Sequence, residues 1–177
     1  MQARGPSLSA LLEEHKGALV AKWLQEMLRT YPEPSVVFLS QQKDPFRNPV
    51  GHTLKEGLPI LFDAIVRPTV TSEMQPVLDS IIRIRAVQDT SASTAVAFIF
   101  LIKRIIKAEF PTEFTRLADE FAALESRIDE LALLAFDLFM KCRDQILELK
   151  ENESRRMSFL VERIQLREAA DPVNKTR

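Results

Sequence analysis

The longest run of apolar side chains covers residues 95–102, where no polar side chain occurs. A helix that is apolar on every side is either buried in a core or crosses a membrane. These eight residues are far fewer than the roughly 20 that a bilayer requires, and Lys103 and Arg104 follow at once. The pattern predicts a central core helix that starts near Ser91, ends at Phe110 and is covered by neighbouring helices on all sides.

Apolar residues at helical spacing predict three earlier helices, over about 7–30, 48–66 and 73–88. Pro32 and Pro34 end the first of these, because proline lacks an N–H group and clashes with a continuing helix. Residues 36–39 then form a short apolar turn in this interpretation. Asn48 followed by Pro49 is typical of an N-cap and a first helical position, and it marks the start of the second helix.

The C-terminal part of the chain predicts a long helix, because neither proline nor glycine occurs from Thr112 to Asp171. Its apolar residues recur in heptads, at Phe114, Leu117, Phe121, Leu124, Ile128, Leu131, Ala135, Leu138 and Cys142. Residues 150–156 are all polar, and a new apolar set follows at Met157, Leu160, Val161 and Ile164. One helix over 112–170 would span roughly 90 Å, so we expect a bend near 150–156 or a helix that leaves the body. We divide the chain into a helical domain over 1–150 and a tail over 151–177, with a polar break, a short helix and a frayed end.

Glycine usage decides the fold class. The chain has four glycines in 177 residues, and none follows Gly57. A β-rich domain would need glycine in its turns, whereas a chain of this length can bury one sizeable core. We therefore predict an all-α fold, namely a single helical-bundle domain with a long C-terminal helix.

Charge and cysteine content narrow the class of partner. The net charge of −1 argues against general nucleic-acid binding, which usually needs a basic excess. No apolar run approaches the length of a membrane span, so we expect no membrane insertion. The first residues contain no apolar leader, so we expect no signal peptide. Cys142 is the single cysteine and cannot form an internal disulfide, which favours a cytoplasmic protein.

Catalytic signals are weak. His15 and His52 are the two histidines, whereas zinc or iron needs three or four clustered ligands. A globin-type haem needs a proximal histidine, usually past mid-chain, and none follows His52. The sequence contains no glycine-rich phosphate loop and no nucleophile elbow. We therefore expect no enzyme activity, no metal and no cofactor.

Two polar stretches are more distinctive, namely 44–49 and 84–91, with His52 and Arg83 close to them in the sequence. The first is a rigid loop rich in proline, and the second places polar groups at the tight turn before the central helix. These stretches supply the candidate surface for a small anion, another ligand or a partner, formed by Asp44, Phe46, Arg47, Asn48, His52, Arg83, Arg85 and Gln88. The alternative is that the same side chains anchor their loops through bonds to the backbone.

The same stretches carry a family resemblance. The segments concerned are 44–51, 81–89, 98–103, 127–129 and 136–143. They resemble the N-terminal domain of the RsbRD type, and the likeness extends over about 8–165. It implies a sensory or regulatory input domain with a fold similar to a globin without haem. Proteins of the RsbR kind add a STAS domain that a kinase phosphorylates within a stressosome. The residues after 165 are too few for that domain, which leaves kinase binding and scaffold assembly open.

Three functional hypotheses follow. The first is a non-enzymatic sensory or regulatory module that forms a homodimer through the 112–149 helix and contacts a signalling or regulatory protein, because sustained heptads favour a partner helix. The second is a phosphotransfer module that uses His52, since a histidine followed by Thr-Leu-Lys is similar to phosphotransfer histidines with a nearby lysine. The third is a plain adaptor whose 157–168 helix docks on another protein.

Overall fold

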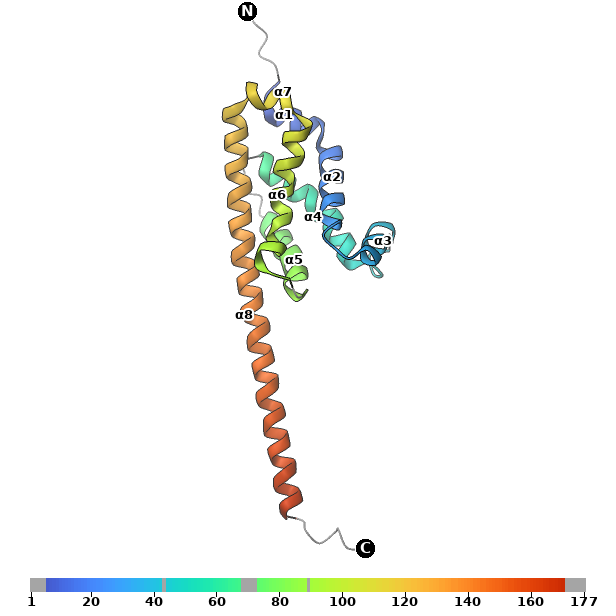
Figure 1. Cartoon of the computed structure of the whole chain (residues 1–177), viewed down its shortest axis with the longest axis vertical. Helices are drawn as coiled ribbons and strands as arrows, with labels where there is room; N and C mark the ends of the chain where they lie inside the picture. Colours follow the sequence, from blue (N-terminus) through green and yellow to red (C-terminus); the bar gives the residue numbers. More distant parts are fainter. Residues whose placement is uncertain (1–5, 43, 68–72, 89, 171–177) are drawn as a thin grey trace, which may run out of the picture. The chain divides into compact units, whose positions relative to one another are not determined.

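The chain is described by a computed structural model over residues 6–42, 44–67, 73–88 and 90–170, with the backbone alone for 168–170 (Figure 1). These residues form eight helices and no strand, which confirms the predicted all-α class. The helices are α1 (Leu8–Glu14), α2 (Lys16–Leu28), α3 (Glu33–Gln41), α4 (Pro49–Val66), α5 (Met74–Val87), α6 (Ala92–Glu109), α7 (Pro111–Arg116) and α8 (Ala118–Ala170). The chain divides into two compact units, residues 1–140 and residues 141–177.

The core of the first unit lies where α4 packs against α2 and α5, and where α2 packs against α6. Its fully buried side chains include Leu19, Trp23, Met27, Leu54, Leu58, Leu61, Phe62, Leu78, Ile81, Ile82, Phe98, Ile99 and Ile102. The Trp23 Nε1 atom donates a 2.7 Å hydrogen bond to the carbonyl oxygen of Phe98 and so fastens α2 to α6. A Cβ atom on Gly57 would lie 2.9 Å from Val77 Cγ1, so glycine allows α4 and α5 to pack closely.

The N-terminal segment differs from the prediction in two places. The expected helix over 7–30 is two helices, because the backbone leaves helical geometry at His15, where φ is −99° and ψ is 6°. The apolar turn expected at 36–39 is wrong, since these residues belong to α3. Pro34 lies in the first turn of α3, where its missing N–H group would have no intrahelical partner in any case.

The helix that we predicted to be central, α6, is only partly covered. Ser91 caps it, since its Oγ atom accepts a 3.2 Å hydrogen bond from Thr94 N. One side is buried against α2 and α5. Ala97 and Phe100 are exposed, and 43% of Phe100 is accessible. The prediction that every side is covered is therefore wrong for the described part of the chain.

The long C-terminal helix starts later than predicted, because the chain leaves helical geometry at Leu117, between α7 and α8. Residues 150–156 are helical, so the polar run does not interrupt α8. In the first unit, α8 buries the predicted heptad positions Phe121, Leu124, Ile128, Leu131 and Ala135. The heptad pattern therefore reports packing within the chain over this part of the helix.

Candidate functional site

The predicted surface begins with the tight turn at 44–48. The Asp44 Oδ1 atom accepts a 2.9 Å hydrogen bond from Phe46 N, and the Asp44 carbonyl accepts from Arg47 N and Asn48 N. Asp44 and Arg47 are exposed, and the Phe46 side chain is 95% exposed. The turn therefore presents an isolated aromatic side chain to solvent.

Asn48 is buried and connects this turn to two helices. Its Nδ2 atom donates to the carbonyl oxygens of Leu39 and Gln42, at 3.0 Å each. Its Oδ1 atom accepts a 2.8 Å bond from Gly51 N and caps α4. These are the side-chain bonds to the backbone that loop anchoring requires. Asn48 is 2% exposed and is not accessible to a partner.

The remaining predicted residues have different environments. His52 is exposed as the fourth residue of α4. Arg83 is exposed on α5, and its Nε atom lies 2.6 Å from Asp79 Oδ2 one turn earlier. Arg85, two residues on, is 2% exposed. Gln88, the C-cap of α5, is partly exposed.

One predicted residue, Gln88, lies at a cavity beside α3 that the sequence analysis missed. The cavity of about 350 Å³ is lined by Tyr31, Pro34, Ser35, Phe38, Leu39, Val50 and Gln88. Gln88 comes from the second stretch, and Val50 is the second residue of α4, directly after the first stretch. Tyr31 connects the cavity to the buried arginine, because its ring centroid lies 5.0 Å from Arg85 Cζ. The signal for this site in the sequence is the apolar run at 36–39, which the sequence analysis interprets as a turn and which belongs to α3.

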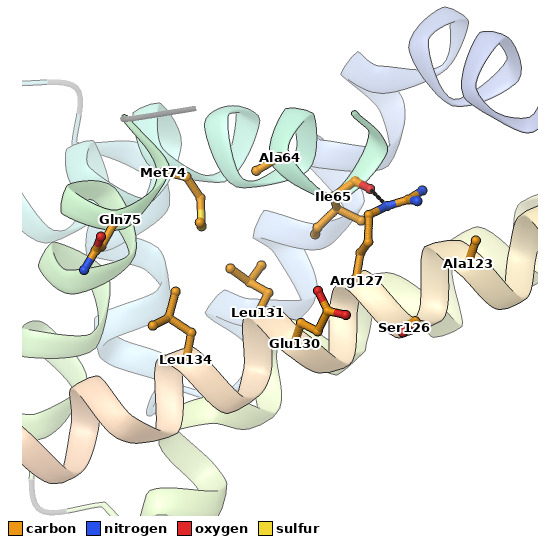
Figure 2. A pocket seen from close by; sticks show the side chains of 10 residues that line it. All are labelled: Ala64, Ile65, Met74, Gln75, Ala123, Ser126, Arg127, Glu130, Leu131 and Leu134. Carbon is orange, nitrogen blue, oxygen red and sulfur yellow. Dashed lines mark hydrogen bonds between the residues drawn. The ribbon is translucent and has the colours of Figure 1, made fainter. Parts of the chain in front are cut away.

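A larger cavity lies between α4, α5 and the part of α8 in the first unit (Figure 2). It has a volume of about 650 Å³ and is lined by Ala64, Ile65, Met74, Gln75, Ala123, Ser126, Arg127, Glu130, Leu131 and Leu134. Met74, Leu131 and Leu134 give it an apolar end. At the other end Arg127 Nε donates a 2.6 Å hydrogen bond to the carbonyl oxygen of Ile65, near the end of α4 (Figure 2).

Ion pairs fix the register between α6 and α8. Lys103 lies 2.5 Å from Asp129, and Lys107 lies 2.6 Å from Glu125. Since the residue number rises on α6 as it falls on α8, the two helices run antiparallel. The N-terminal turns of α8 are also held by Glu120, whose Oε2 atom accepts a 2.8 Å bond from Leu8 N at the start of α1.

An exposed apolar surface lies beside these ion pairs. Leu133, Phe136 and Met140 follow Asp129 on one face of α8, at steps of four, three and four residues. Phe100 lies one turn before Lys103 on α6, and Lys103 Nζ lies 5.7 Å from its ring centroid. In the antiparallel register set by these ion pairs, Phe100 is opposite residue 132 of α8, which is adjacent to Leu133 in the sequence. We call these four residues the α6/α8 patch, and each of them is at least 42% exposed.

Within the residues that the structure describes, no group of three histidine, cysteine, aspartate or glutamate side chains could hold a metal ion. In the same part of the chain, no helix combines the length and the hydropathy that crossing a membrane would need.

The comparisons with known proteins agree with the resemblance noted in the sequence. The family model described as the RsbT co-antagonist protein rsbRD N-terminal domain matches residues 17–154, which is well over half of the chain. No curated protein and no solved structure matches significantly, so the expected likeness to globins stays a prediction. The chain belongs to the RsbT co-antagonist protein rsbRD N-terminal domain family.

Proposed function

We propose that this chain is a non-enzymatic input module of signal transduction that forms a homodimer through the α6/α8 patch and passes its signal to a regulatory protein. Membership of a family of regulatory signalling domains supports the signalling role, and the family suggests a stressosome-type input domain. The patch supports the homodimer, because contiguous exposed apolar surface marks interaction sites.

The observation that carries the proposal is the uncovered side of α6 next to an uncovered seam on α8. Five of the heptad residues that first suggested a dimer are buried within the first unit, namely Phe121, Leu124, Ile128, Leu131 and Ala135. A second chain cannot use these five. Leu133, Phe136 and Met140 form another set with the three-and-four spacing of a helix-pairing seam. A second copy placed here would cover both α8 and the exposed ring of Phe100.

In this proposal the cavity of Figure 2 is where the module binds its input ligand. It lies between α4, α5 and the same segment of α8 that carries the patch, and Leu131 and Leu134 of α8 line it. A ligand that binds there with different affinity in two positions of α8 would shift the equilibrium between them. The position of α8 would in turn alter the patch.

Light scattering of the full chain tests the homodimer. At about 20 µM we expect a molar mass near twice the 20.2 kDa of one chain, since buried apolar contacts of this kind support micromolar association. The double variant Leu133→Glu/Phe136→Glu places charge in the patch and should yield the monomer mass with unchanged circular dichroism.

Phe46→Glu is the matched control, because Phe46 is exposed but lies in the 44–48 turn and not in the patch. It should keep the dimer mass. A wild-type chain that is monomeric at this concentration, or a dimer that survives the double variant, would contradict the proposal.

Two other predictions remain. Phosphotransfer at His52 stays a prediction, and so does docking of the 157–168 segment on another protein. The second receives some support within the second unit, since Met157, Leu160, Val161 and Ile164 are about half exposed or more and lie on one helical face. This face is a candidate for the contact with the regulatory protein.

A further inference from the structure

The most deeply buried charge among the described residues belongs to Arg85 of α5, which is 2% exposed. Removing a guanidinium group from water is costly unless a carboxylate pairs with it and its N–H groups are bonded. Within the described residues no carboxylate pairs with Arg85. Its Nη1 atom donates to Thr30 Oγ1 at 3.1 Å, and its Nη2 atom donates to the carbonyl oxygen of Thr94 at 3.3 Å. Both acceptors are neutral, so no residue that the structure describes supplies a counterion.

Two buried polar groups at this place also have no hydrogen-bond partner among the described residues. They are Arg85 Nε and the hydroxyl oxygen of Tyr31. The two side chains are in contact, with Arg85 Cζ 5.0 Å from the centroid of the Tyr31 ring. The contact between cation and ring offsets part of the desolvation cost but supplies no hydrogen-bond acceptor.

Buried donors in native proteins are almost always paired, and an unpaired one calls for a specific explanation such as a bound water or ion. A water molecule could accept one of these bonds, but it would leave the positive charge uncompensated. A small anion would satisfy both requirements at once, because its oxygen atoms accept hydrogen bonds and its charge offsets that of the guanidinium group.

A neighbouring cavity reaches Tyr31, the side chain that contacts Arg85. Tyr31 lines the cavity of about 350 Å³ next to α3, together with Gln88, which follows Arg85 by three residues at the end of α5. We propose that a small anion with acceptor oxygens, either a carboxylate or an inorganic oxyanion, enters by this cavity and binds to Arg85 and Tyr31. The site differs from the α6/α8 patch and does not depend on the proposed homodimer.

The proposal predicts saturable stabilisation of the full chain by the anion, because a ligand that binds the folded state raises its unfolding temperature. The measurement is the unfolding temperature during titration with sodium phosphate and, separately, sodium acetate, with sodium chloride keeping the ionic strength constant. One of the two should give a hyperbolic rise. Saturation by acetate but not phosphate identifies a carboxylate ligand, and the reverse identifies an inorganic oxyanion.

Variants locate the site. Tyr31→Phe removes one hydroxyl group and should weaken the anion about tenfold, the effect of one hydrogen bond. Arg85→Gln should abolish the saturable response. Arg83→Gln, two residues away on the exposed side of α5, should leave it unchanged.

Loss of Arg85 could also unfold the chain. The affinity of the Tyr31→Phe variant, which keeps Arg85, is therefore measured separately by isothermal calorimetry with the same two anions. No saturable response in the wild-type chain would overturn the proposal, and it would mean that the chain satisfies Arg85 by itself. An equal response in wild type and Tyr31→Phe would overturn it as well, since anion binding would then lie elsewhere.

Discussion

Arg127 of α8 donates a 2.6 Å hydrogen bond from Nε to the carbonyl oxygen of Ile65, one residue before the end of α4. Carbonyl groups in the last turn of a helix lack intrahelical partners and carry a partial negative charge. Glu120 makes the opposite contact, since its carboxylate accepts from Leu8 N at the start of α1. In the first unit, two charged side chains of α8 therefore bind the ends of other helices. Arg127 binds the C-terminus of α4, and Glu120 binds the N-terminus of α1.

Loss of the Arg127 contact should destabilise the first unit. Arg127→Ala leaves the Ile65 carbonyl without its charged donor, and we expect the free energy of unfolding to fall by about 1–2 kcal/mol. Urea unfolding followed by circular dichroism measures it. Arg104→Ala is the control, because Arg104 is an exposed arginine on α6, and it should change stability by less than about 0.5 kcal/mol. Equal effects of the two variants would show that the Ile65 contact does not stabilise the fold.

Two glycines should respond in opposite ways to the same substitution. A Cβ atom on Gly51 would lie 2.6 Å from the carbonyl oxygen of Leu39, whereas one on Gly17 meets no atom within 4 Å. Gly51→Ala should cost about 2–3 kcal/mol, because backbone must move. Gly17→Ala, on the exposed face of α2, should gain about 0.5 kcal/mol through the lower entropy of the unfolded chain. Thermal unfolding of both variants measures the two changes in stability. A Gly51→Ala protein as stable as the wild type would refute the close approach of α3 and α4.

Asn48 should matter more than an ordinary helix cap. Asn48→Ala removes the cap of α4 and two donations to carbonyl groups, one buried and one partly buried, so we expect a loss of about 2–3 kcal/mol. Ser91→Ala removes the cap of α6 at an exposed position and should cost about 1 kcal/mol. Chemical unfolding of the two variants gives the comparison. If they lose the same stability, the bonds from Asn48 to α3 contribute nothing beyond capping.

The sequence predicted those features that short-range patterns determine. Asn48 and Pro49 marked the start of α4 correctly, because capping depends on adjacent residues. Helix α3 was missed because Pro32 and Pro34 were interpreted only as the end of the preceding helix. Proline is also tolerated in the first turn of a new helix, which is where Pro34 lies. This error arose because the same prolines are compatible both with the end of one helix and with the start of the next.

The sequence could not predict which side chains are buried or which residues cover them. The spacing of Phe121, Leu124 and Ile128 showed that one face of α8 is covered, but it could not show that the same chain covers it. Arg85 and Arg83 are alike in the sequence, yet one is buried beside Tyr31 and the other is exposed. Only the packing of α5 against its neighbours separates the two, so the sequence could name both arginines as candidate site residues but could not choose between them.

Cysteine crosslinking tests most directly whether two chains meet at the α6/α8 patch. In a Cys142→Ala background, which removes the single native thiol, Phe136→Cys and Met140→Cys place thiols in the patch and Phe46→Cys places one in the 44–48 turn. Mild oxidation should convert at least one of the patch variants rapidly to a disulfide-linked dimer, with Phe46→Cys remaining monomeric over the same time. Crosslinking at residues 136 and 140 that is no faster than at residue 46 would contradict a dimer at this surface.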